Sequence, residues 1–345
     1  MNNPPFNPNN AGIPNGNYFA LPYSIEEAEV VLLSVPWDAT VSYRAGTHRG
    51  PKAMIEASAQ IDLYDSVVPK AWEVRIGTLP AIRGLAGKNR TARKAAEEVI
   101  AVWERGEEPN PYNPSLSLVN EACGWLHQNV CRATREYLEK GKIVGIVGGE
   151  HSVPLGTIEA LCDYYPSFGI LHIDAHADLR RAYEGFRYSH ASIMYHALTF
   201  SQVNSLVQVG VRDYCQDEAS LIKTNNKIHC FTDEYLHRNL FEGETWKQLC
   251  MQVIEKLPPQ VYISFDIDGL SPDLCPNTGT PVPGGLSFRE ADFLLYTLAT
   301  SGKRIIGFDL CEVAPAHNNE WDANVGARIL YKLCCYSHLS QNDIR

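Results

Sequence analysis

Six side chains of the types that bind divalent metal ions follow three short apolar runs, and they are His151, Asp174, His176, Asp178, Asp266 and Asp268. Residues at alternating positions of a strand share one face, so the segments DAHAD and DID each present their ligands together. One such pair alone more often forms a turn or a helix cap. Because ligand sites in parallel sheets gather beyond the carboxyl ends of the strands, acids and imidazoles at several strand ends predict one convergent metal site.

The charge of these residues indicates how many ions the site holds. Four of the six are aspartates, and their carboxylates repel one another when they are buried together. One divalent ion leaves about two negative charges uncompensated, whereas two ions balance all four aspartates. Oxygen-rich coordination with some imidazole and no thiolate suits Mn²⁺, with Ni²⁺, Co²⁺ or Zn²⁺ as alternatives. We therefore expect two Mn²⁺ ions per subunit.

The predicted ligands belong to a series of apolar runs rich in Val and Ile, at 30–35, 143–147, 169–173, 206–211, 261–265 and 304–308. Continuous apolarity predicts strands buried on both faces, and hence an α/β fold with a mostly parallel sheet covered by helices. Helices are predicted from Gly50, over 91–105 and over 116–140. Residues 1–20, rich in Asn and Pro, predict an extended arm, and residues 21–345 predict a single domain.

Composition limits the partners and the compartment. The chain of 345 residues has a formal net charge of −10 and no long block of Lys and Arg, which argues against nucleic acid as a partner. Its ten cysteines are scattered without a CxxC pair, as is typical of buried thiols in a reducing compartment. No apolar run approaches the roughly 20 residues that span a bilayer, and the first residues do not read as a signal peptide. We expect a cytoplasmic protein without membrane contact.

Five segments together resemble a known family, and they are SVPWDATVSYRAGTHRGPKAMIEAS, GGEHS, HIDAHADL, SFDIDGLSPDLCPNTGTPVPGGLS and CEVAPAHN. They resemble the ureohydrolase superfamily of arginases, agmatinases, guanidinobutyrases and formiminoglutamases, and look closest to agmatinases. The likeness covers residues 28–335 with interruptions. It implies the three-layer αβα fold of arginases and a homo-oligomer, either a trimer or a hexamer.

The resemblance also implies a role for each predicted ligand. One manganese would be bound by His151, Asp174, Asp178 and Asp266. The other would be bound by Asp174, His176, Asp266 and Asp268, so that two aspartates bridge the ions. A hydroxide bridging the metals would attack the guanidino carbon and release urea, because metal binding lowers the pKa of water toward neutral pH. Asp178 would also orient that hydroxide.

Two further residues match catalytic positions of the family. His190 would carry a proton to the leaving amine, a role that suits imidazole because its pKa lies near working pH. Glu312 would bind the guanidinium through paired, charge-assisted hydrogen bonds. A buried acid without a cation is costly, so the structural alternative for Glu312 is a salt bridge to a nearby Arg.

Three features depart from the family pattern. Glu150 stands where the family more often has Asp, His317 and Asn318 occupy a segment that often reads Tyr-Asp in agmatinases, and residues 85–115 form an additional segment. Because Glu150 adjoins a predicted ligand, we expect it to alter the surroundings of the metals and not their number. The other two departures bear on the substrate.

The substrate depends on the predicted entrance loop, residues 179–189. The loop lacks the Asn- and Ser/Thr-rich character of arginases and resembles agmatinases, so agmatine, cleaved to putrescine and urea in polyamine metabolism, is the first expectation. Glu184 would meet a distal ammonium. Arg180, Arg181 and Arg187 would instead suit the carboxylate tail of guanidinobutyrate or guanidinopropionate. Arginine and free guanidine are further alternatives.

Two other classes of protein are compatible with the same segments. A non-catalytic, metal-stabilised relative is expected to have lost a ligand, His190 or Glu312, and this chain has all of them. A deacetylase on the related arginase–deacetylase fold needs one zinc and fewer ligands. The number of metal ions bound per chain therefore separates these classes.

Overall fold

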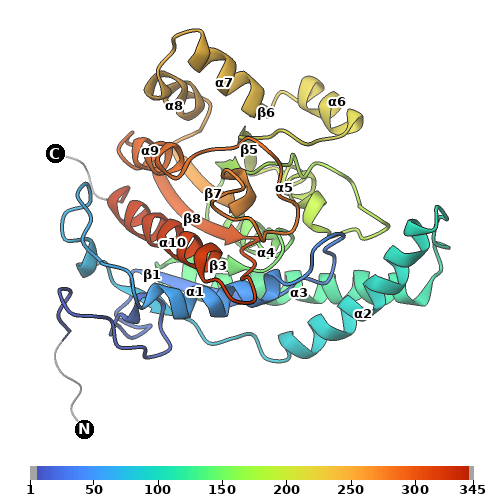
Figure 1. Ribbon diagram of the computed structural model, residues 1–345, viewed down its shortest axis with the longest axis horizontal. Helices are drawn as coiled ribbons and strands as arrows, with labels where there is room; N and C mark the ends of the chain where they lie inside the picture. Colours follow the sequence, from blue (N-terminus) through green and yellow to red (C-terminus); the bar gives the residue numbers. More distant parts are fainter. Residues whose placement is uncertain (1–5, 342–345) are drawn as a thin grey trace.

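The computed structural model describes residues 6–341, which form one sheet of eight parallel strands in the order β2-β1-β3-β8-β7-β4-β5-β6 (Figure 1). The strands are β1 (Val30–Val35), β2 (Ile76–Thr78), β3 (Ile143–Gly148), β4 (Phe168–Ile173), β5 (Val203–Val209), β6 (Ile228–Phe231), β7 (Gln260–Asp266) and β8 (Arg304–Cys311). The parallel sheet confirms the predicted fold class. The two edge strands, β2 and β6, were not predicted, because each is short and carries little of the apolar pattern.

Helices cover both faces of the sheet and complete three layers. One apolar cluster joins a face of the sheet to α1 (Gly50–Ser58), α7 (Asp233–Phe241), α8 (Trp246–Glu255), α9 (Phe288–Ala299) and α10 (Trp321–Leu339). The other joins the opposite face to α2 (Leu85–Glu104), α3 (Pro114–Leu138), α4 (Leu155–Leu161), α5 (Ile193–Ala197) and α6 (Gln216–Thr224). Short 3-10 turns lie at Tyr18–Ala20, Thr47–Arg49, Ala71–Glu73, His190–Ser192 and Ile267–Gly269.

Helix α2, which lies in the additional segment, and the following helix α3 lie side by side along one edge of the molecule (Figure 1). Helix α2 begins at Leu85, six residues before the predicted start, because Leu85, Asn89 and Ala92 continue the buried face at helical spacing. Helix α3 begins where Asn113 accepts a hydrogen bond from the backbone N–H of Ser115 and Pro114 occupies the first turn. Both helices are therefore longer or shifted by a few residues relative to their predicted ranges.

The last residues of the predicted N-terminal arm are packed against the core and not extended. Tyr18, Phe19 and Ala20 form a 3-10 turn and are buried, and the Tyr18 hydroxyl lies 2.8 Å from Ser34 Oγ of β1. Two aromatic side chains gain more by packing against the core than by staying in an extended arm. Residues 9–16 are exposed, and residues 1–5 of the predicted arm lie outside the described residues.

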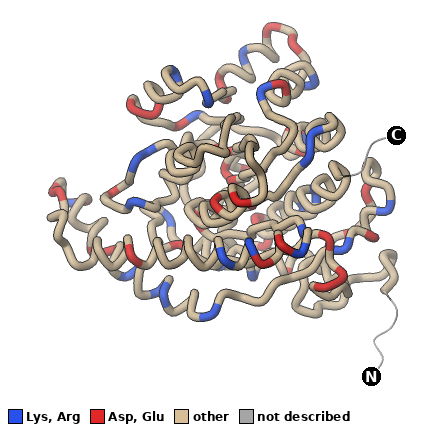
Figure 2. Tube along the Cα trace, turned by 180° about the vertical axis from the view of Figure 1, so that it is seen from behind, with Lys and Arg blue, Asp and Glu red and all other residues tan. Residues whose placement is uncertain are grey.

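Lys and Arg are interspersed with Asp and Glu along the described chain (Figure 2). All ten cysteines are free thiols, and seven of them are buried, as their apolar neighbours predicted. Among residues 6–341, no helix has the length and apolarity needed to cross a membrane.

Candidate metal centre

The four adjacent strands β3, β8, β7 and β4 occupy the middle of the sheet, and their carboxyl ends carry all of the predicted ligands. His151 follows β3 through Gly148 and Gly149. A Cβ atom on Gly149 would lie 2.0 Å from the carbonyl oxygen of Trp37, and one on Gly148 would lie 2.4 Å from Cys311 Sγ. Only glycine lets the chain turn this closely between β1 and β8, so the two glycines bring His151 to the edge of the sheet.

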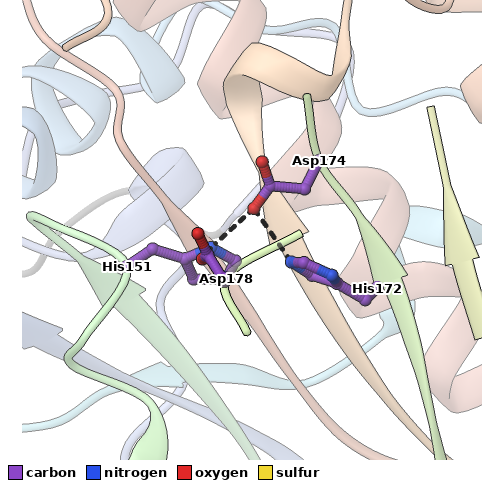
Figure 3. Close-up of side chains that lie close together, drawn as sticks. All are labelled: His151, His172, Asp174 and Asp178. Atoms are coloured by element: carbon purple, nitrogen blue, oxygen red, sulfur yellow. Dashed lines mark hydrogen bonds and ion pairs between the residues drawn. The ribbon is translucent and has the colours of Figure 1, made fainter. Parts of the chain in front are cut away.

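One group of ligands surrounds the imidazole of His151 (Figure 3). Its Nδ1 lies 3.0 Å from Asp174 Oδ2, 3.2 Å from Asp178 Oδ2 and 3.3 Å from Asp266 Oδ2. Three carboxylate oxygens from two different strand ends therefore converge on one nitrogen. These four residues are the set that the resemblance assigned to the first metal.

A second group surrounds His176. Its Nδ1 lies 3.2 Å from Asp268 Oδ2 and 3.5 Å from Asp174 Oδ1. Asp174 thus faces His151 with one carboxylate oxygen and His176 with the other. A carboxylate shared in this way is suited to bridge two neighbouring ions, and the structure brings all six predicted ligands together.

Burial and charge at this site call for cations. The four aspartates and His151 are almost inaccessible, with exposures of 5% or less. Burial, together with the charge of Asp174, raises the pKa of Asp178 to about 6, and burial with Asp268 and Asp174 raises the pKa of Asp266. Against the opposing cost of burial, Asp268 and Asp174 raise the pKa of His176 to about 12. Protons on the imidazoles offset the crowded carboxylates here, and divalent ions suit the same donor set.

Metal binding is expected to release at least two protons per chain at pH 7. Neighbouring aspartates raise the pKa values of His151 and His176 in spite of burial, so both imidazoles are protonated before metal binds, and a ligand must give up its proton. Apparent affinity should therefore rise with pH, by about one decade per pH unit for each proton released. Titration calorimetry in two buffers of different ionisation enthalpy measures this number. A count of zero, or an affinity that falls as pH rises, contradicts the assignment of the two histidines.

Buried polar residues behind the ligands hold them in place, and sequence analysis missed most of them. Ser264 Oγ lies 2.9 Å from His151 Nε2, and Asp309 Oδ1 lies 3.5 Å from the same nitrogen. His172 Nε2 lies 2.8 Å from Asp174 Oδ2. Such contacts orient the ligands and fix the imidazole tautomers. Ser264 and His172 each stand two positions before a ligand on the same strand face, a spacing that could have identified them.

Two of the predicted catalytic residues have a backbone conformation that L-residues rarely adopt. Asp178 has φ +54° and Glu312 has φ +63°. Such conformations cost on the order of 1–3 kcal/mol and gather at functional sites. Glu312 is held there because its N–H donates to the carbonyl of Gly149 (2.7 Å) and its Oε1 accepts from the N–H of His151 (2.9 Å).

Glu312 is a buried carboxylate without a cationic partner. Its exposure is 6%, and within residues 6–341 no Lys, Arg or His side chain forms an ion pair with it. Burial and the nearby Glu150 raise its pKa. The alternative expected for Glu312, a salt bridge to a nearby Arg, does not form among the described residues. A cationic ligand would instead pair with this carboxylate.

A cavity at this edge of the sheet brings the predicted catalytic residues to the ligands. It offers about 160 Å³ to water-sized molecules. Its lining includes five of the predicted ligands and both further catalytic residues, and they are His151, His176, Asp178, Asp266, Asp268, His190 and Glu312. His190 begins a 3-10 turn, and its ring stands edge-on to Tyr183 with the ring centroids 5.9 Å apart.

Other residues considered for the substrate lie elsewhere. Glu184 and the exposed His317 and Asn318 are outside the lining of this cavity. Instead, the carbonyl of Glu184 accepts a hydrogen bond from Trp103 Nε1 of α2 (3.1 Å), and the carbonyl of Gly185 accepts one from Asn120 Nδ2 of α3. The additional helical segment thus supports the entrance loop from outside.

Several known proteins resemble this chain over most of its length. The family model described as Arginase family matches residues 28–335. An N(1)-aminopropylagmatine ureohydrolase of Thermus thermophilus is 33% identical, over 89% of each chain. An agmatinase of Bacillus subtilis is 30% identical, over 89% of this chain and 91% of the relative. The solved agmatine ureohydrolase of Thermoplasma volcanium has a TM-score of 0.72 at 22% identity, over 94% and 95% of the two chains.

The chain belongs to the Arginase family. It is, as the sequence predicted, a hydrolase of the ureohydrolase type, which releases urea from a guanidino compound. The family is dependent on two metal ions, and the buried His and Asp groups of this chain fit such a centre.

Proposed function

We propose that this enzyme hydrolyses agmatine, or its longer relative N(1)-aminopropylagmatine, to urea and an amine. The observation that carries the proposal is the buried carboxylate of Glu312, which forms no ion pair within residues 6–341 and lines the same cavity as the histidine and aspartate cluster. A guanidinium group is planar and offers N–H donors in a fork that matches a carboxylate. The names of the relatives at 33% and 30% identity support the two candidate substrates.

Two Mn²⁺ ions are part of the proposal. His151, Asp174, Asp178 and Asp266 would hold one, and Asp174, His176, Asp266 and Asp268 the other. The ions would supply hydroxide near neutral pH by lowering the pKa of bound water. The imidazole and carboxylate donors, without thiolate, favour manganese over a soft metal.

The remaining residues act on the substrate itself. Glu312 would grip the guanidinium and hold its carbon near the aspartate cluster. Burial, reinforced in the metal-free chain by the charge of protonated His176, lowers the pKa of His190 to about 4, so the imidazole is neutral at pH 7. Bound cations in place of that proton would favour the neutral imidazole in the same way. A neutral imidazole can accept a proton and pass it to the leaving amine, which departs as a neutral molecule.

The charges at the mouth of the cavity favour a cationic tail over a carboxylate tail. Arg180 is already engaged, since its Nε lies 3.8 Å from Glu218 Oε2 and its guanidinium stacks on Tyr183 at 4.9 Å. Asp213 lines the same cavity, is exposed, and has no ion-pair partner within residues 6–341. An ammonium group beyond the guanidinium would meet the free carboxylate, whereas a carboxylate tail would be repelled by it.

Urea release from a panel of guanidino compounds tests this proposal. The manganese-loaded enzyme is assayed with agmatine, N(1)-aminopropylagmatine, 4-guanidinobutyrate, arginine and guanidine. The expected order places the two amine-tailed compounds first, each with a kcat/KM at least about tenfold above the others, the value of one good charge contact. A higher kcat/KM for guanidinobutyrate or guanidine contradicts the assignment of the tail.

Replacing Asp213 by Asn is expected to raise the KM for agmatine by about two- to fivefold, because an exposed charge contact contributes up to about 1 kcal/mol. The value of kcat should stay within about twofold, since Asp213 does not touch the guanidinium end. Asp217→Asn, an exposed change on α6 outside the cavity lining, serves as the matched control. An unchanged KM for Asp213→Asn would remove this residue from substrate binding.

A cytoplasmic location and a homo-oligomeric assembly, as a trimer or hexamer, complete the proposal. The ten free thiols suit a reducing compartment. Light scattering on the purified protein measures the assembly, and a monomeric mass at micromolar concentration contradicts it.

A further inference from the structure

A continuous set of hydrogen bonds connects His190 to a second buried carboxylate that is neither a predicted ligand nor a substrate contact. Thr40 Oγ1 lies 2.8 Å from Glu150 Oε1 and 3.4 Å from His190 Nδ1, and it accepts from the backbone N–H of His190 at 3.2 Å. Thr40 and Glu150 are both fully buried. The three residues come from separate loops, after β1, after β3 and at the end of the entrance loop.

The donors around Glu150 are fixed by its other contacts. Its Oε2 accepts from the backbone N–H of Thr40 (2.7 Å), and its Oε1 accepts from the hydroxyls of Ser152 (2.6 Å) and Thr40 (2.8 Å). The ionised carboxylate of Glu150 only accepts, and a hydroxyl has a single proton, so Thr40, having donated it to Glu150, faces His190 only as an acceptor. With Glu150 ionised, the contact at His190 Nδ1 is therefore an Nδ1–H that donates to Thr40 Oγ1.

We propose that Thr40 and Glu150 are positioning residues, which fix the ring of His190 in the Nδ1–H tautomer and leave Nε2 as the nitrogen that exchanges protons with the substrate. The proposal rests on the role of His190 in the proposed function. In a neutral imidazole one nitrogen donates and the other accepts, so the partner of one nitrogen decides the chemistry of the other.

Replacing Glu150 by Gln is expected to reverse the set of hydrogen bonds. The amide oxygen has to occupy the Oε2 position, because the backbone N–H of Thr40 can only donate. The amide NH₂ then faces the hydroxyl of Thr40, which turns its proton toward His190 Nδ1. His190 would become the Nε2–H tautomer, with the wrong nitrogen protonated for uptake of a proton.

The test compares Thr40→Val, Thr40→Ser and Glu150→Gln in the fully metal-loaded enzyme. Thr40→Val and Glu150→Gln are expected to lower kcat by about 10- to 100-fold, as for other residues that orient a functional imidazole. KM should change by less than about threefold, and both metal ions should remain bound. Thr40→Ser keeps the hydroxyl and should restore kcat to within about threefold of the wild type. Thr134→Val, at a buried threonine paired with Thr157, is the matched control and should leave kcat unchanged.

Two further measurements separate this role from a purely structural one. In the His190→Ala background, Thr40→Val should cause no additional loss of kcat, since the group it orients is gone. ¹⁵N NMR of the imidazoles, in enzyme loaded with diamagnetic Mg²⁺, should show the Nδ1–H form of His190 in the wild type and the Nε2–H form in Glu150→Gln. An additional loss in the His190→Ala background, no loss with Thr40→Val, or an Nε2–H tautomer in the wild type each overturns the proposal. The NMR result stands even where no substrate yields urea, so failure of the proposed function remains distinguishable.

Discussion

Replacement of Asp174 by Asn is expected to lower kcat for urea release by at least about 1,000-fold and to reduce the metal content from two ions per chain toward one. Asp174 faces His151 with Oδ2 and His176 with Oδ1, so it serves both groups of predicted ligands. An amide cannot provide two anionic oxygens. Partners that only orient a ligand cost about 10- to 100-fold when they are replaced, and loss of the shared ligand itself should exceed that range.

Metal analysis by mass spectrometry and a steady-state urea assay measure both effects on the same preparation. Asp65→Asn is the matched control, because Asp65 is also a nearly buried aspartate but pairs with Lys332 at 2.6 Å, far along the chain from the ligands. It should lower stability while both ions stay bound. An Asp174→Asn enzyme with two ions and a kcat near the wild-type value would remove the shared-ligand role.

Replacement of His190 by Ala is expected to lower kcat by about 10²- to 10⁴-fold, the usual contribution of a general acid–base residue, with metal content unchanged. His190 lines the cavity but makes none of the contacts within the ligand groups. Burial lowers its pKa to about 4, and a cation at the neighbouring metal site favours the neutral imidazole as well, so the loss should be similar from pH 6 to pH 9.

A pH series of kcat for wild type and His190→Ala gives this comparison. His229→Ala, which removes a half-buried imidazole of the edge strand β6, outside the lining of the cavity, is the control and should retain kcat. If His190→Ala kept the wild-type kcat over this pH range, His190 would have no part in proton transfer.

The convergence of the six predicted ligands could be predicted because each follows a buried strand within a few residues. The chain order of DAHAD and DID fixes which side chains reach the strand ends, and parallel pairing of β4 with β7 then brings the segments together. The prediction of two ions followed from the charge of the four aspartates. The convergence of these ligands could be predicted without knowing the order of the strands, because all strands of a parallel sheet end at the same edge.

The residues that orient the ligands were harder to predict, because a polar residue within an apolar strand does not by itself reveal its partner. His172 stands two positions before Asp174 on the same strand face, whereas Ser264 contacts His151 because β3, β8 and β7 are neighbours in the sheet. Thr40 lies 110 positions from Glu150 and 150 from His190, so no local pattern could connect them.

The charge of the substrate's tail could not be predicted from the sequence either. Three arginines in the entrance loop left a carboxylate tail open, and only the structure places Arg180 beside Glu218 and onto the ring of Tyr183. Glu184, which was expected to meet an ammonium, lies outside the cavity lining, whereas Asp213, from a different loop, lines it. Whether a loop arginine is free to bind a substrate carboxylate depends on its tertiary contacts, which the sequence of the loop does not show.

A titration of the metal-free enzyme with Mn²⁺, followed by urea release from agmatine, tests the central claim most directly. Two metal sites that share Asp174 predict that activity continues to rise until two equivalents per chain are bound, and that a third equivalent adds nothing. Full activity at one equivalent, or no urea from agmatine or N(1)-aminopropylagmatine at any metal content, would contradict a two-metal ureohydrolase acting on these substrates.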